Sequence, residues 1–159
     1  VYRTTKRLDP TRPVIDTSGW EHVETDLLDA HDYEQDPASF RETYGKIDGP
    51  VEPSGHDHTE WSEELSYVSE YGGIWGNPDS EAGWGYGDRP ADEAAFFERY
   101  RGLTETLLEN PPMWAFCYTQ LYDIEPETNG LYTYAREPKF DSTRIREINE
   151  QTAAFERGE

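Results

Sequence analysis

Short apolar runs alternate along this chain with longer stretches of mixed apolar and polar residues. Four runs rich in β-branched or aromatic residues have the length of strands, at residues 13–15, 27–31, 65–69 and 114–119. Helix-like stretches lie between or after most of them. This alternation is typical of a parallel sheet with crossover helices. The sequence therefore predicts an α/β fold with four strands.

Three helices carry clear sequence signals. Asp36 and Pro37 are an N-cap and a first helical residue, and they open a helix that runs to about Tyr44. Residues 91–109 show apolar side chains at near-helical spacing, and the last helix begins near Asp141. The chain also opens in what is expected to be the tail of a helix.

Two segments rich in glycine or proline, residues 49–58 and 72–90, are expected to be loops. The second is long and holds Trp75, Trp84 and Tyr86. A long aromatic segment without secondary structure is typical of a functional loop.

Composition narrows the class of protein. The chain has 159 residues, enough for one domain with a real core, and its 5 Trp, 11 Tyr and 6 Phe argue against disorder. A net charge of −20 disfavours nucleic acid and anionic membranes as partners. No apolar run has the length of a membrane span. Cys117 is the single cysteine, so no internal disulfide forms.

Glu70 is the strongest candidate for chemistry. It ends a strand-like run, and Gly72 and Gly73 follow almost at once. Ligands and catalytic groups collect at the carboxyl ends of parallel strands, and glycines let the backbone turn sharply beside them. The alternative is an ordinary acidic residue at a strand end.

Two further strand ends carry candidate binding groups. His31 and Tyr33 alternate onto one side of their strand, where they can bind sugar hydroxyls or orient a carboxylate. Tyr118 and Gln120 offer an aromatic face and an amide, which also suit a sugar. The alternatives are a solvated acidic loop for the first pair, and plain strand packing for the second, as expected for Phe116 and Cys117.

Three other patterns do not support a site. His56 and His58 lie in a polar loop without obvious further ligands, so no metal site is expected. Residues 123–127 imitate a calcium loop, but Thr128 and Tyr134 stand where its glycine and bidentate glutamate belong. Cys117 lacks a neighbouring base.

Five motifs in the same order resemble glycoside hydrolase family 2, and most closely its β-galactosidase-type members. They are residues 8–14 with 18–20, 31–33, 68–73, 116–121 with 123–125, and 129–134. The resemblance implies a (β/α)8 TIM barrel that follows a jelly-roll sugar-binding domain and immunoglobulin-like domains. Residues 1–159 would be the C-terminal half of that barrel, with strands five to eight and their helices.

The resemblance also implies roles for particular residues. Glu70 matches the nucleophile of a retaining β-glycosidase, and Tyr33 matches the tyrosine that hydrogen-bonds it. The residues that would line the sugar subsite are His31, Trp20, Trp75, Tyr118 and Gln120. β-Galactosides are the favoured substrates, with no cofactor and no metal ligand in this chain.

One departure from the family pattern is important. The acid/base glutamate of the family follows an asparagine at the end of strand four, and no such pair stands upstream of Arg12. The one Asn-Glu pair, Asn149 and Glu150, falls in the last helix. This chain alone is therefore expected to be inactive. Its expected partners are a carbohydrate, the missing N-terminal half of the barrel with the upstream sugar-binding domain, or a second copy of itself.

Two other interpretations remain open at the level of sequence. One is a noncatalytic carbohydrate-binding or scaffold domain that kept the pocket and lost the chemistry. The other is an α/β domain whose aromatic residues form its core. The motifs do not distinguish a cytoplasmic protein from a secreted one.

Overall fold

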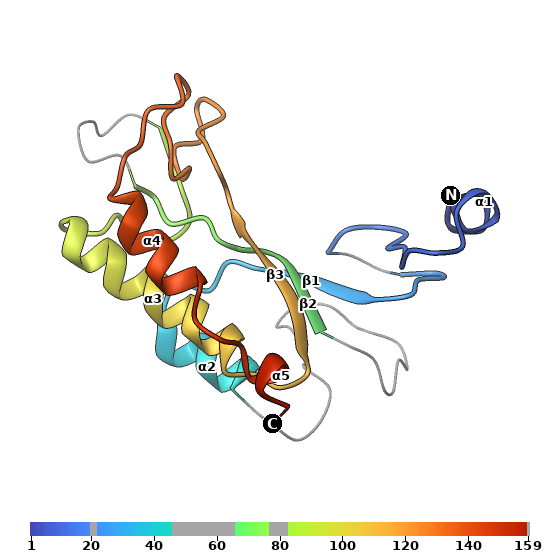
Figure 1. The fold of residues 1–159 in the computed structure, drawn as a ribbon. Coiled ribbons are helices and arrows are strands. Elements are labelled where there is room, and N and C mark those ends of the chain that lie inside the picture. The colour runs from blue at the N-terminus through green and yellow to red at the C-terminus, as the bar shows by residue number, and fades with distance from the viewer. Residues whose placement is uncertain (20–21, 46–65, 77–82, 159) are drawn as a thin grey trace.

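The chain folds as an α/β protein with a three-stranded parallel open sheet. The structure is a computed structural model that describes residues 1–19, 22–45, 66–76 and 83–158. Strands β1 (Leu28–Asp32), β2 (Ser66–Gly72) and β3 (Met113–Thr119) lie in that order across the sheet. Helices α2 (Pro37–Tyr44) and α3 (Glu93–Leu108) fall between them in sequence (Figure 1). The α/β prediction is confirmed.

Side-chain caps begin the helices where the sequence predicts. Asp36 accepts a hydrogen bond from the N–H of Ala38 at the start of α2. Asp92 and Asp141 cap α3 and α4 (Ser142–Asn149) in the same way. Each cap satisfies a backbone donor that has no partner inside the helix. Helix α1 (Tyr2–Leu8) confirms that the chain opens in a helix. The last helix begins as expected but ends at Asn149, and Phe155 belongs to a separate short helix, α5 (Ala154–Arg157).

The core lies between the sheet and helices α2, α3 and α4, which cover one of its faces (Figure 1). Tyr71 of β2 occupies its centre, fully buried, with its hydroxyl 2.8 Å from that of Thr104 on α3. The buried members of this cluster are Phe40, Tyr44, Val68, Tyr71, Ile74, Phe96, Phe97, Tyr100, Leu103, Leu107, Met113 and Ile148.

The expected strand at residues 13–15 is wrong. These residues form a loop, and Val14 bonds to Asp26 rather than to a neighbouring strand. The Val14 N–H donates to the Asp26 carboxylate at 2.8 Å, and the Val14 carbonyl accepts from the Asp26 N–H at 2.9 Å. Pro13 has no N–H to offer a sheet. A short β-branched run is thus held as a loop by one aspartate.

A bulge in β2 decides which side chains face the core. The pairing advances one residue on β1 but two on β2, from Val68 to Glu70, so Ser69 is the extra residue. Strict alternation would put Val68 and Tyr71 on opposite faces. Both are buried in the core instead, and Ser69 and Glu70 both contact groups on the other face. Bulges re-aim side chains in this way.

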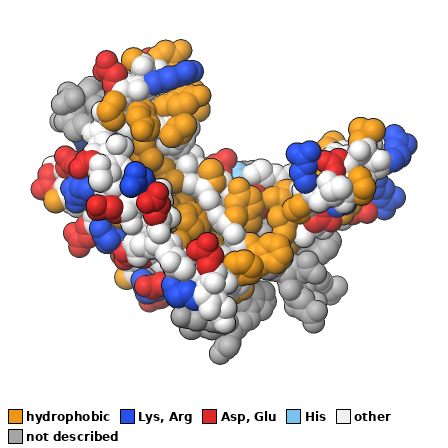
Figure 2. All heavy atoms as spheres, viewed as in Figure 1, with side chains coloured by type: hydrophobic (Ala, Val, Ile, Leu, Met, Phe, Trp, Pro, Cys, Tyr) orange, Lys and Arg blue, Asp and Glu red, His pale blue; other side chains and the backbone are white. Residues whose placement is uncertain are grey.

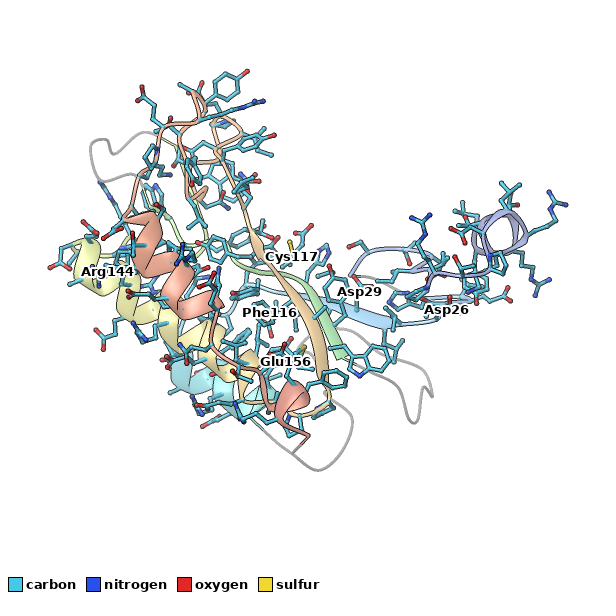
Figure 3. All side chains as sticks on the ribbon, viewed as in Figure 1. Asp26, Asp29, Phe116, Cys117, Arg144 and Glu156 are labelled. Carbon is cyan, nitrogen blue, oxygen red and sulfur yellow. The ribbon has the colours of Figure 1, made fainter. Side chains whose placement is uncertain are left out.

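None of the described helices covers the opposite face of the sheet. Phe116 packs against the core and Cys117 is exposed, and on β3 they point to opposite sides (Figure 3). The prediction of strand packing is therefore confirmed for Phe116 and is wrong for Cys117. Apolar side chains gather in the hollow between the helical body and the N-terminal segment (Figure 2). Trp114, 51% exposed, stacks obliquely on Phe155 of α5.

Within the described ranges, no helix combines the length and the apolar composition needed to cross a bilayer.

Candidate active site

Glu70 lies beside two groups of the neighbouring strand β1. His31 is its direct partner in the parallel register, and the His31 Nδ1 atom lies 3.6 Å from the Glu70 Oε2 atom. Tyr33 follows the end of β1, and its hydroxyl donates a hydrogen bond to the same oxygen. The structure thus brings together three of the predicted site residues at the carboxyl ends of adjacent strands. The Glu70 side chain stays 38% exposed, so a ligand can reach it.

Tyr33 is held rigidly in its place. Its ring stacks on Tyr86 from the 72–90 loop, with the ring centroids 3.6 Å apart and the planes 7° from parallel. Burial and the hydrogen bond to the Glu70 carboxylate raise the pKa of Tyr33 well above its usual value. The hydroxyl therefore keeps its proton at ordinary pH and remains a donor to the carboxylate.

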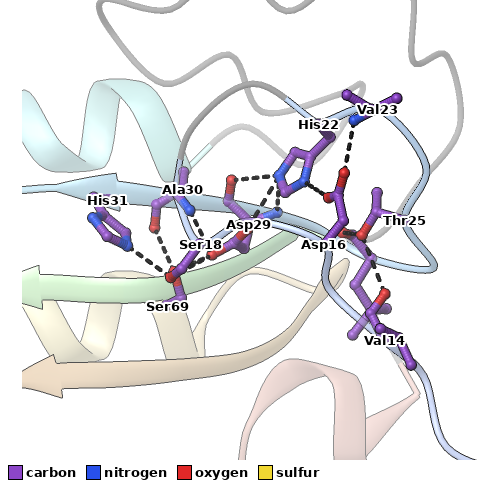
Figure 4. Close-up of polar contacts among 12 residues, drawn as sticks. Val14, Asp16, Ser18, His22, Val23, Thr25, Asp29, Ala30, His31 and Ser69 are labelled. Atoms are coloured by element: carbon purple, nitrogen blue, oxygen red, sulfur yellow. Dashed lines mark hydrogen bonds and ion pairs between the residues drawn. The ribbon is translucent and has the colours of Figure 1, made fainter. Parts of the chain in front are cut away.

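Behind His31 lies a second, buried carboxylate that the sequence reasoning missed. Asp29 stands two residues before His31 on β1, and its side chain is fully buried. Its Oδ2 atom accepts hydrogen bonds from the Gly19 N–H at 2.9 Å and from the hydroxyls of Ser18 and Ser69 (Figure 4). Alternation along the strand places Asp29 on the same face as His31, and this pattern could have identified Asp29 from the sequence.

Asp16 and His22 hold the loop that supplies Ser18. The His22 Nδ1 atom lies 2.7 Å from Asp16 Oδ1, and its Nε2 atom lies 3.1 Å from Asp29 Oδ1 (Figure 4). Burial acts to raise the pKa of Asp16, but hydrogen bonds from His22 and from the N–H groups of Val23 and Glu24 outweigh it, so the pKa lies far below its usual value. Asp16 thus stays ionised and fixes the loop.

Tyr118 and Gln120 lie at the end of β3. Tyr118 packs against the core, and its hydroxyl accepts the Ile74 N–H at 3.2 Å. Burial raises the pKa of Tyr118 well above its usual value. Gly72 lies against this ring, where a Cβ atom would come within 2.3 Å of it. The Nε2 atom of Gln120 is buried and, among the described residues, has no hydrogen-bond partner.

Trp75 lines a cavity of about 450 Å³ with Phe96 and Phe140. In the described part of the chain, no hydrogen bond or ring contact joins it to Glu70. Trp20 lies outside the described residues, as do His56 and His58. The described residues contain no group of three or more His, Cys, Asp or Glu side chains that could hold a metal ion.

No protein-family model matches this sequence, and no curated protein matches it significantly. The fold and the site define an α/β protein with a hydrogen-bonded carboxylate at its strand ends.

Proposed function

We propose that this chain supplies the nucleophile of a retaining β-glycosidase, with β-galactosides as the favoured substrates. The observation that carries the proposal is the Glu70 carboxylate, which lies at the carboxyl end of the central parallel strand and accepts the Tyr33 hydroxyl. The motif resemblance to glycoside hydrolase family 2 also implies that Glu70 is the nucleophile and that Tyr33 hydrogen-bonds it. His31 lies against the same carboxylate oxygen and would contact the bound sugar.

In this mechanism Glu70 attacks the anomeric carbon, and the bond from that carbon to the leaving oxygen breaks. Water then attacks the glycosyl-enzyme and releases the sugar with retained configuration. Tyr33 would hold the Glu70 carboxylate in place for the first step through its hydrogen bond. The acid that protonates the leaving group is proposed to lie upstream of this chain. With residues 1–159 alone, the leaving group would therefore depart unprotonated, and the reaction would be slow.

We also propose that the sheet is part of a (β/α)8 barrel. The parallel strands support this, as do the helices on one face and an opposite face that no described helix covers. In a barrel that opposite face lines the interior, and β3 pairs with a further strand. The missing strands would come from the N-terminal half.

A 2-fluoro glycoside with a good leaving group tests the function. Such a compound should trap the glycosyl-enzyme in the intact protein, and peptide mass spectrometry should find the adduct on Glu70. Glu70→Gln should abolish the adduct. Glu98→Gln, a change at an exposed position of α3, is the matched control and should label normally. Sugar binding by the wild type without any adduct would instead identify a noncatalytic carbohydrate-binding domain.

A further inference from the structure

The further inference concerns Asp29 and Ser18, which lie behind His31 and away from Glu70. A fully buried carboxylate is costly unless its oxygens are well satisfied. The Oδ2 atom of Asp29 accepts hydrogen bonds from Gly19, Ser18 and Ser69, and its Oδ1 atom, which has no hydrogen-bond partner among the described residues, lies 3.1 Å from His22 Nε2 (Figure 4). Two of these residues, Ser18 and Gly19, also contact His31. Asp29 therefore fastens the turn that holds the His31 ring.

The contacts to the ring come from a hydroxyl and from backbone. The Ser18 Oγ atom lies 2.9 Å from His31 Nε2. Gly19 lies so close that a Cβ atom on it would come within 2.1 Å of His31 Cδ2. The ring is therefore held at its Nε2 edge by the turn, and its Nδ1 atom is the nitrogen that faces Glu70.

The hydroxyl of Ser18 has one proton and three neighbours, Asp29, His31 and Ser69, and Ser69 itself donates to Asp29. An ionised carboxylate only accepts hydrogen bonds, whereas a neutral imidazole has one nitrogen that donates and one that accepts. If Ser18 donates to Asp29, the oxygen of Ser18 is left to accept from His31 Nε2. The hydrogen bond on one ring nitrogen sets the state of the other.

We propose that Asp29 and Ser18 are positioning residues that keep the hydrogen of neutral His31 on Nε2. The Nδ1 atom beside Glu70 is then an acceptor, suited to a hydroxyl group of a sugar bound at the nucleophile. This second statement rests on the proposed glycosidase function, and the first does not.

The test is ¹⁵N NMR of the full chain labelled with ¹⁵N-histidine, at a pH where the His31 ring is neutral. The sequence has 4 histidines, and His31→Gln identifies the signals of interest. Long-range correlations to the ring C–H protons show which nitrogen carries the hydrogen. The wild type should carry it on Nε2. Ser18→Ala and Asp29→Asn should each shift most of it to Nδ1, since one removes the acceptor and the other supplies an amide that can donate to Ser18.

Ser69→Ala is the matched control. It removes the second hydroxyl from Asp29 together with a 3.3 Å contact to Ser18 Oγ. It leaves Asp29 as the acceptor for Ser18 and keeps the contact between Ser18 and His31, so the Nε2 hydrogen should persist. Ser18 is exposed, so Ser18→Ala should fold even if Asp29→Asn does not. A wild-type hydrogen on Nδ1, or no change in Ser18→Ala, would overturn the inference.

A kinetic measurement separates this inference from the proposed function. In the intact protein, Ser18→Ala should lower kcat/KM for an aryl β-galactoside by about tenfold, the value of roughly one hydrogen bond. An intact protein without glycosidase activity but with the Nε2 tautomer contradicts the proposed function and leaves the positioning role standing. Glycosidase activity together with a hydrogen on Nδ1 contradicts the positioning role and leaves the proposed function standing.

Discussion

The hydroxyl of Tyr33 donates a hydrogen bond to the Oε2 atom of Glu70, a residue 37 positions further along the chain. The contact forms because β1 and β2 run in parallel side by side, so that their carboxyl ends meet. It joins a donor that keeps its proton to the carboxylate that we propose as the nucleophile.

Loss of this hydroxyl should slow the first step of the proposed glycosidase reaction. In the intact protein, Tyr33→Phe is expected to reduce the rate of glycosyl-enzyme formation by about one to three orders of magnitude. Stopped-flow or fluorosugar inactivation kinetics measure that rate. Tyr86→Phe is the control, because it preserves the stacked ring and should change the rate little. Full activity in Tyr33→Phe would show that Tyr33 is misassigned.

A methyl group at Gly19 should disturb His31. Gly19 has φ +70°, and its added Cβ would overlap the His31 ring. Gly158 has nearly the same dihedral, φ +71°, with nothing within 4 Å of a Cβ. Gly158→Ala should therefore show only the backbone cost of about 1 kcal/mol in urea unfolding. Gly19→Ala should lose more stability than Gly158→Ala does. In the intact protein, its rate of inactivation by the fluorosugar should fall by about a hundredfold. Equal behaviour of the two variants would contradict the contact.

The buried ion pair of Lys139 and Asp123 should be sensitive to removal of one partner. Their charged atoms lie 2.8 Å apart, and their side chains are 3% and 7% exposed. Burial lowers the pKa of Lys139, and the contact with Asp123 opposes this. Lys139→Met should cost about 3–5 kcal/mol in urea unfolding, because it leaves Asp123 buried without its cation. The double variant Lys139→Met/Asp123→Leu should recover most of that loss, and no recovery would argue against the pair.

Stability should fall as the pH rises above about 10, where unfolded tyrosines lose their protons. Burial raises the pKa of Tyr71 in the folded chain, so the folded state binds more protons there than the unfolded state. The contribution of Tyr71 to the free energy of unfolding is therefore present below about pH 10 and is lost as the pH rises above it. Burial raises the pKa of Tyr33, Tyr44 and Tyr118 as well, whereas Lys139 acts in the opposite direction.

Urea-unfolding midpoints across this pH range measure the effect. Tyr71→Phe should show a shallower decline than the wild type. The control Tyr134→Phe, at a residue that is 65% exposed, should decline as the wild type does. A flat wild-type profile would contradict the burial of these hydroxyls.

Residues 1–159 in isolation should self-associate. The two outer strands of the sheet, β1 and β3, each have one side without a partner strand among the described residues. Open edges beside exposed apolar groups favour association. Trp114→Glu should shift the chain towards monomer in sedimentation velocity, whereas Leu8→Glu, on the exposed helix α1, should not. A monomeric wild type with robust glycosidase turnover would contradict both the half-barrel proposal and the placement of the acid upstream.

The amino-acid sequence by itself determined where α2, α3 and α4 begin and the order of the three strands with the helices between them. Asp36, Asp92 and Asp141 cap their helices because capping is a contact between residues two or three apart. The alternation of strands and helices likewise depends on local patterns. Glu70 was identifiable because a strand pattern stops beside it and glycines follow.

Only the tertiary structure decided the rest of the site. The bulge at Ser69 turns Glu70 and Ser69 to one face and Tyr71 to the other, and the register with β1 sets it. Asp29 looked like one more acid among 34 acidic residues, yet it is buried where the turn, β2 and His22 converge on it. A periodic pattern specifies a face relative to its own strand, but burial and partners depend on chain segments that are distant in sequence.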